Sequence, residues 1–97
     1  MLAIGRRKLA ILILRILRDG SMRYSRLQHA VSRASPDVVH PKTLTNTLNF
    51  LRDARLIERH QDRHGTDYRL TVGGAELTEL IGELERWIRE YRTGEDK

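Results

Sequence analysis

The chain contains no cysteine, no low-complexity segment and no long hydrophobic run. The absence of cysteine excludes disulfides, thiolate zinc sites and redox sensing through a thiol. The most apolar run, Leu9–Leu17, is interrupted by Arg15 and is far too short to span a bilayer. It also lacks the small-residue cleavage site that ends a signal peptide. These absences favour a cytoplasmic protein that does not enter a membrane.

Acidic residues are scarce in the first three-quarters of the chain. Residues 1–71 carry fourteen Lys and Arg against six Asp and Glu, whereas residues 72–97 carry four against seven. The net charge of the whole chain is +5. This balance indicates a polyanionic partner, with nucleic acid first and an acidic membrane surface second. Arginine outnumbers lysine fifteen to three, which suits bidentate contacts to phosphate and guanine.

A length of 97 residues suits one small domain, and 39% hydrophobic with 32% charged residues is the composition of a globular chain. We expect that domain to span residues 1–92 and residues 93–97 to form a flexible tail. A core of this size is marginal for a monomer, so burial against a second subunit would stabilise it.

Helical spacing of apolar residues marks both ends of the chain. Residues 5–20 are apolar on nearly every side up to Gly20, a natural helix C-cap, which is typical of a helix buried on more than one side. A longer helix after Thr71, its expected N-cap, carries an apolar seam that steps by three and four residues. We predict that both helices contact a second copy of the chain. The predicted interface residues are Ile11, Leu14, Leu77, Leu80, Leu84, Trp87, Ile88 and Tyr91.

Two shorter helices are expected between them. One spans about Ser25 to Arg33 with Ser25 as its N-cap, and the next begins at Pro41, which suits a first helical turn. The second of these has leucines at positions 44, 48 and 51 on one side and mainly amides, hydroxyls and a lysine on the other. Amides and hydroxyls can read base edges. The residues expected to contact DNA from this face are Lys42, Thr43, Thr45, Asn46 and Asn49.

Two short alternating runs, residues 56–61 and 67–71, flank Gly65 and predict a β-hairpin. Three helices, a hairpin and a last helix form the winged helix-turn-helix arrangement, a mainly α fold with a small β-hairpin. In that fold the third helix enters the major groove, and the hairpin is the wing. Arg63 and His64 at its tip would contact the minor groove or its phosphates.

The start of the second predicted helix offers a further DNA contact. A helix N-terminus with nearby arginine favours phosphate. This group consists of Arg23, Tyr24, Ser25 and Arg26. A simple capping role for Ser25 and a core position for Tyr24 are equally compatible with the sequence.

Histidine and aspartate gather in the hairpin, at His60, Asp62, His64 and Asp67. A zinc site needs three or four convergent ligands, and here arginine is interleaved with them, which opposes cation binding. No pattern pairs a nucleophile with a base. We therefore expect no metal, no cofactor and no enzymatic activity.

The stretch TLTNTLNFLRDARLIERH (residues 43–60), followed by DYRLTVGGAEL (67–77), resembles the HxlR-type winged-helix transcriptional regulators, within the broader MarR/ArsR-like group. Residues 13–27, ILRILRDGSMRYSRL, are similar to the family's ILxxLxxGxxRFSEL. The resemblance implies a homodimeric DNA-binding repressor or activator whose first and last helices form the dimer interface. The family's common N-terminal cysteine is missing, and Arg55 stands where a glycine is usual.

Two alternatives stay open. The domain could bind protein instead of DNA, in which case Phe50 would be exposed on the recognition face. It could also sense a small molecule at the dimer interface, where Trp87 and Tyr91 could line a pocket, although packing is the commoner role of aromatics at helical spacing. The effector of such a sensor is unknown.

Overall fold

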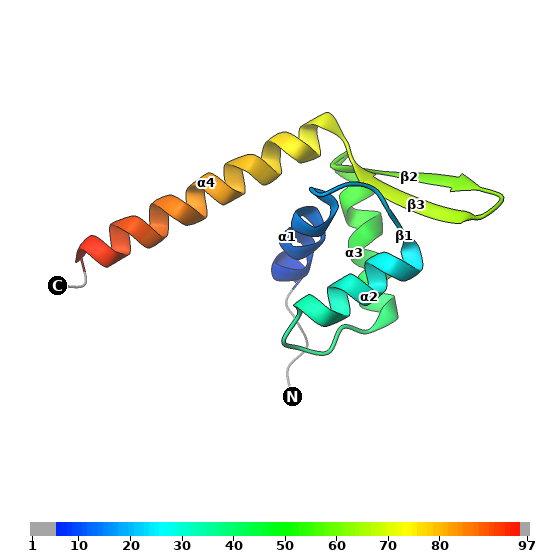
Figure 1. Ribbon diagram of the computed structural model, residues 1–97, viewed down its shortest axis with the longest axis horizontal. Helices are drawn as coiled ribbons and strands as arrows, with labels where there is room; N and C mark the ends of the chain where they lie inside the picture. The colour runs from blue at the N-terminus through cyan, green and yellow to red at the C-terminus, as the bar shows by residue number, and fades with distance from the viewer. Residues whose placement is uncertain (1–5, 96–97) are drawn as a thin grey trace.

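The computed structural model describes residues 6–95, and within them the chain forms four helices and three strands (Figure 1). The order confirms the predicted winged helix-turn-helix fold. Its elements are α1 (Arg6–Leu17), β1 (Met22–Arg23), α2 (Tyr24–Ala34), α3 (Pro41–Asp53), β2 (Ile57–Asp62), β3 (Gly65–Leu70) and α4 (Val72–Glu95). None of the helices in this range combines the length and apolar character needed to cross a membrane.

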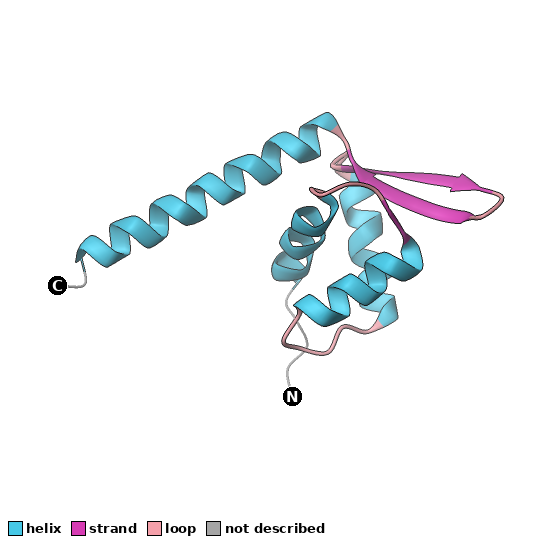
Figure 2. Ribbon diagram, in the orientation of Figure 1, coloured by secondary structure: helices cyan, strands magenta, loops and turns pink. Residues whose placement is uncertain are grey.

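The sheet has three antiparallel strands in the order β1-β3-β2, one more than the predicted hairpin (Figure 2). In the additional strand, Met22 pairs with Tyr68, and Arg23 pairs with Asp67. Two residues are too few to produce the alternation by which a strand is recognised in a sequence. Pairing with β1 leaves the hairpin, the wing of the fold, joined through its inner strand to the start of α2.

The core lies where α1, α2 and α3 meet the base of the sheet. The three leucines of α3 expected on one side of that helix belong to it and are 1% exposed. The buried apolar residues are Leu9, Ile13, Leu14, Leu17, Leu27, Val31, Leu44, Leu48, Leu51, Ile57 and Tyr68. Leu14, predicted to contact a second copy, is 2% exposed and packs inside the single chain instead. Because α1 is apolar nearly all round, its sequence pattern does not distinguish the side that meets α2 and α3.

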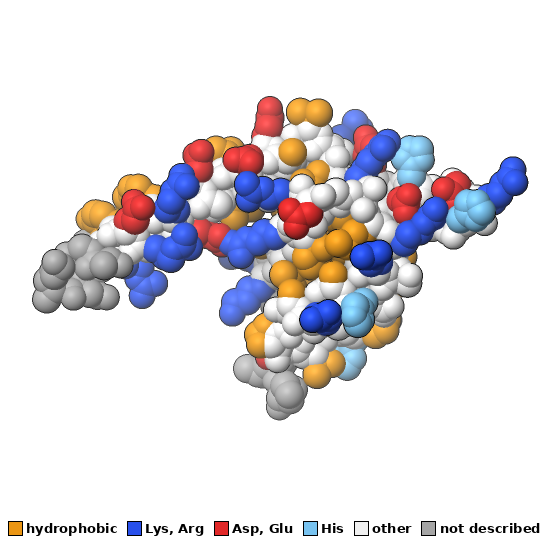
Figure 3. All heavy atoms as spheres, in the orientation of Figure 1, with side chains coloured by type: hydrophobic (Ala, Val, Ile, Leu, Met, Phe, Trp, Pro, Cys, Tyr) orange, Lys and Arg blue, Asp and Glu red, His pale blue; other side chains and the backbone are white. Residues whose placement is uncertain are grey.

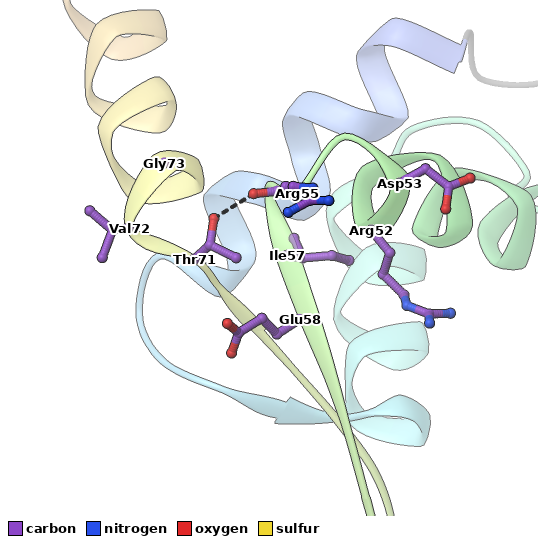
Figure 4. A pocket seen from close by; sticks show the side chains of 8 residues that line it. All are labelled: Arg52, Asp53, Arg55, Ile57, Glu58, Thr71, Val72 and Gly73. Atoms are coloured by element: carbon purple, nitrogen blue, oxygen red, sulfur yellow. Dashed lines mark hydrogen bonds between the residues drawn. The ribbon is translucent and has the colours of Figure 1, made fainter.

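A tight junction connects the loop after α3 (residues 55–57) with the start of α4 (residues 71–74). The Thr71 hydroxyl donates to the Arg55 carbonyl at 2.7 Å (Figure 4) and accepts from the Gly74 amide at 2.9 Å, which confirms Thr71 as the N-cap. A Cβ atom on Gly74 would overlap the carbonyl oxygen of Leu56 and lie 2.9 Å from its carbonyl carbon. Only glycine therefore allows α4 to begin so close to this loop.

Arg55 occupies the conformation that the missing glycine would favour. Its φ is +63°, in the left-handed region, and it is the only non-glycine residue of the described chain with a positive φ. The left-handed conformation crowds the Cβ atom of an L-residue against its own backbone. The turn therefore keeps its shape despite the substitution, at a cost in strain.

Two elements project from the body in different directions, the wing and the outer part of α4 (Figure 1). Leu77 and Ile81, near the start of α4, pack against the core. Arg15 of α1 forms an ion pair with Glu85, and Arg18, directly after α1, forms one with Glu79. Beyond this point α4 leaves the body. It runs to Glu95, so residues 93–95 are helical although a flexible tail was predicted, and residues 96 and 97 lie outside the described residues.

Candidate DNA-binding surface

The outer face of α3 is polar, exposed and held by a buried inner face. Leu44, Leu48 and Leu51 anchor the helix in the core, and the buried Thr47 donates its hydroxyl to the Thr43 carbonyl at 2.8 Å. Of the residues predicted to contact DNA, Thr43 is half-buried. The others are exposed, namely Lys42, Thr45, Asn46 and Asn49. The helix therefore holds amides, a hydroxyl and a lysine on a rigid support, as base reading requires.

The N-terminal end of α3 favours a negatively charged partner. Pro41 is its first residue, as predicted, and His40 at the N-cap forms no side-chain capping bond. No acidic residue lies in the first turn, whereas Lys42 does. The positive end of the helix dipole and the Lys42 ammonium therefore both make the potential at this end positive.

The wing presents Arg63 and His64 in the turn between its two long strands, as the hairpin pattern predicted. Both side chains are exposed, and Gly65 directly after them has a φ of +134°. Figure 3 shows basic and histidine side chains at the end of the wing that lies farthest from the body, with acidic side chains close behind them. At the opposite end, Ile57 and Tyr68 are buried and fix the wing to the core.

The start of α2 differs from the prediction. The helix begins at Tyr24, with Arg23 at the N-cap and no side-chain capping bond, so Ser25 is not the cap. Tyr24 packs against the core, where the centroid of its ring lies 6.4 Å from the ring centroid of Tyr68. Ser25 and Arg26 are exposed and remain available to a phosphate.

Arg23 is engaged within the protein. Its Nη1 atom lies 3.1 Å from Oδ1 of Asp62, and its Nε atom lies 3.3 Å from Oδ1 of Asp67. The pKa of Asp62 is lowered, first because Arg23 donates a hydrogen bond to its carboxylate and then because the His64 amide does so too. The residues predicted as a phosphate contact therefore separate into one arginine bound by carboxylates and one, Arg26, that faces solvent.

The histidine and aspartate cluster of the hairpin is divided between different interactions. Asp62 and Asp67 pair with Arg23, while His60 lies opposite Asp67 in the strand register. Within residues 6–95 no three His, Cys, Asp or Glu side chains are grouped as a metal ion would require. The two carboxylates that resembled metal ligands in the sequence, Asp62 and Asp67, form ion pairs with Arg23 instead.

The outer face of α4 exposes large apolar side chains. Trp87 and Tyr91 stack on each other with ring centroids 4.9 Å apart and planes 7° from parallel, and they are 58% and 53% exposed. We call the exposed apolar residues of this helix from position 80 onward the α4 stripe: Leu80, Leu84, Trp87, Ile88 and Tyr91. Figure 3 shows apolar side chains along this projecting helix. Of the other predicted interface residues, Ile11 and Leu77 are half-buried.

Two hollows lie beside these surfaces. One, of about 530 Å³, is almost wholly apolar and is bounded by α1, the end of α3 and the first part of α4, with Ile11, Phe50 and Ile81 among its lining residues. Phe50 is 58% exposed there. The other, of about 660 Å³, surrounds the junction and has mixed charge, with Arg52 and Arg55 beside Asp53 and Glu58 (Figure 4). The apolar groove was not predicted, because it depends on how three helices meet, and the exposure of Phe50 was expected only for a domain that binds protein.

Comparisons with known proteins place this arrangement in a family. A model of HxlR-like helix-turn-helix proteins matches residues 4–96. A PadR family transcription regulator from Clostridium difficile is similar in structure, with a TM-score of 0.77 and 22% identity over 89% of this chain and 95% of the other. The reduced transcriptional regulator YodB from B. subtilis gives a TM-score of 0.70 and 23% identity over 80% and 74%.

A protein assigned as the transcriptional regulator ytfH, from Salmonella typhimurium, has 27% identity over 90% of this chain and 76% of the other, with a TM-score of 0.69. The comparison with curated proteins gave no match. All three similar structures are thus described as transcription regulators, and the similarity extends over most of each chain.

Proposed function

Because the chain belongs to the HxlR-like helix-turn-helix family and is therefore a DNA-binding transcription regulator and not an enzyme, we propose that it acts on DNA as a homodimer. In this proposal α3 of each subunit enters the major groove. The wing tip lies against the minor groove, and α1 and α4 form the contact between subunits. The domain of residues 1–92 then carries both DNA binding and dimerisation. We expect the protein to act in the cytoplasm.

The outer face of α3 is the observation that carries the proposal. It exposes Lys42, Thr45, Asn46 and Asn49 from a helix whose inner face is fixed in the core. Asparagine can donate and accept at the same adenine, and lysine can reach guanine. The exposed Arg63 and His64 of the wing supply cationic or polar groups beyond the ends of that helix. Phosphate contacts would provide most of the affinity.

The α4 stripe supports dimerisation. Five large apolar side chains on one helix are exposed in the single chain, which is unusual for a protein surface that contacts only water. A second copy can cover them through the same residues, as in a two-fold interface. The two α3 helices would then meet successive major grooves of a pseudo-palindromic site, about 34 Å apart.

A salt series tests DNA binding, with genomic fragments and the full chain. We expect log Kd to rise linearly with log salt concentration, because phosphate contacts release counterions. A flat salt dependence, or no complex at low salt, contradicts the proposal.

Asn46→Ala tests base reading by α3. We expect it to relax the preference at one base position and to leave binding to random DNA nearly unchanged. Gln61→Ala is the matched control, since it removes an exposed amide from the wing, outside α3. Equal losses on selected and random DNA for Asn46→Ala would contradict a base-reading role.

The apolar groove favours a second function, small-molecule sensing. Its volume of about 530 Å³ lies within the usual range of ligand pockets, and it touches α3 through Phe50 and Leu51. A bound effector would therefore contact the recognition helix and could change its position. A screen for compounds that raise the melting temperature, repeated with Phe50→Ala, tests this function. Stabilisation of both proteins to the same extent would place the effector elsewhere.

A further inference from the structure

Arg23 links three parts of the molecule that are distant in sequence. It lies in β1, directly before α2, and its backbone pairs with that of Asp67 in β3. Its side chain extends along the sheet, with Nε 3.3 Å from Asp67 and Nη1 3.1 Å from Asp62 at the end of β2. One guanidinium therefore contacts both strands of the wing from the helical body.

The wing tip, residues 62–65, is built around this contact. The Asp62 oxygen that accepts from Arg23 also accepts the His64 amide at 2.8 Å. A Cβ atom on Gly65 would lie 3.4 Å from Nη1 of Arg23, so the guanidinium passes directly over the backbone of this glycine. The carboxylate that shapes the turn is thus held in place by an arginine of the body.

Little else holds the outer part of the wing. Ile57 is buried at its base, but every later residue of β2 is exposed. Among the described residues, the other ion pair of the wing, Arg69 to Glu58 at 3.1 Å, joins β2 to β3 and does not reach the body. Arg23 is therefore the side chain that ties the outer wing to the helices.

We propose that Arg23 is a positioning residue for the wing tip. It acts on DNA binding through Asp62 and the Arg63 and His64 side chains that this carboxylate orients, and not through a phosphate contact of its own. The proposal rests on the proposed function, because it needs a wing that touches DNA. It also gives Asp62 a purpose, since an acidic group next to a DNA-contacting arginine otherwise only weakens binding.

Asp62→Asn tests the proposal by the sign of its effect. Removing a negative charge near DNA should tighten binding if charge alone matters. If the carboxylate positions the tip, the same change weakens binding, by up to about fivefold for each wing, the upper range for an exposed ion pair. Asp53→Asn is the matched control, because it removes an exposed carboxylate from the end of α3 and should leave binding unchanged or tighter. Tighter binding of Asp62→Asn would overturn the proposal.

A double-mutant cycle gives an independent result. Arg23→Gln should weaken binding when Arg63 is present and have a clearly smaller effect in the Arg63→Gln protein, where only the contribution through His64 remains to be lost. Arg26→Gln, an exposed arginine three residues away, should add to Arg63→Gln. Arg23→Lys should restore little, since an ammonium cannot bridge two carboxylates as a guanidinium fork does. Additive losses for Arg23 and Arg63, or full activity of Arg23→Lys, would show a direct phosphate contact instead.

The free protein allows a test that does not depend on DNA. In Arg23→Gln the backbone amides of Arg63 and His64 should have lower NMR order parameters, while Arg26→Gln should leave them unchanged. An unchanged tip in Arg23→Gln would overturn the proposal whatever the DNA result. If the wild-type protein shows no salt-dependent DNA binding while the tip loosens as expected, the proposed function fails and the positioning of the tip by Arg23 stands.

Discussion

The wing and the outer part of α4 leave the same helical body in different directions, and their surfaces are opposite in kind (Figure 1). The wing is a narrow hairpin whose exposed residues are mostly charged or polar, with Arg63 and His64 at its end. The α4 stripe exposes five large apolar side chains, two of them stacked aromatics. A charged hairpin suits a phosphate backbone, while an apolar helix face suits another protein surface.

If the α4 stripe forms the proposed dimer contact, DNA binding and self-association should be physically separable in this chain. Both projections nevertheless start from one junction, where the α3–β2 loop packs on the first turn of α4 through Thr71 and Gly74. Substitutions in the junction should therefore affect both activities, whereas substitutions in one projection should affect one.

Gly74→Ala should have the largest effect. Its Cβ atom would overlap the Leu56 carbonyl, so the loop or the helix must move. We expect a loss of about 3 kcal/mol in the free energy of unfolding, the cost of severe overpacking, with DNA binding and dimerisation both weakened. Chemical denaturation at fixed protein concentration measures it. Gly73→Ala is the control, because its Cβ would meet only the Thr71 hydroxyl at 3.8 Å. Equal stability of the two variants would contradict the packing seen at Gly74.

Leu84→Asp should separate dimerisation from the rest of the protein. Leu84 is 56% exposed in the α4 stripe, so the single chain should fold normally. A charge at the centre of an apolar interface should weaken dimerisation by about 2 kcal/mol or more. Sedimentation should show a monomer at concentrations where the wild type is a dimer. Val72→Asp, at an exposed apolar residue outside the stripe, should leave the mass unchanged. A monomeric wild type would sink the dimer proposal itself.

Arg63→Ala should weaken DNA binding and leave dimerisation unchanged, the reverse of Leu84→Asp. For each wing, loss of one phosphate contact should weaken binding about fivefold at about 0.15 M salt and lower the salt slope by about 1. The loss should be the same on all sequences, and sedimentation should still show the wild-type mass. An unchanged salt slope would mean that the wing tip does not reach the phosphates.

Arg55→Gly should have the smallest effect, and it should be stabilising. Glycine removes the strain of a φ of +63° but gains freedom in the unfolded chain. We expect a net gain of about 0.5 to 1 kcal/mol, visible as a higher melting temperature at fixed concentration, with wild-type affinity for DNA. A lower melting temperature would mean that the Arg55 side chain makes a contact worth more than the strain.

Local patterns in the sequence were sufficient to predict much of this architecture. The leucine spacing of α3, Pro41 at its start, the Thr71 cap and the strands around Gly65 all depend on neighbours within a few residues. The family match extends over the same region. The outer face of α3 could therefore be named before the fold was known, although its role in base reading stays a prediction.

The remaining features depend on contacts between distant residues. Arg23 and Asp62 are separated by 39 positions, and no periodicity connects them. The burial of Leu14 depends on which side of an all-apolar helix meets α2 and α3. The apolar groove arises where three helices converge. Such features follow from tertiary packing, which residue spacing alone does not encode.

The length of α4 gives the junction at Gly74 a mechanical importance. With 24 residues the helix is about 36 Å long. A tilt of about 5° where it leaves Gly74 would displace its far end by about 3 Å. That distance is close to the ~3.4 Å rise of one base pair. In the proposed dimer, the close contact between this glycine and the Leu56 carbonyl therefore determines which spacing of half-sites the two subunits can bind together.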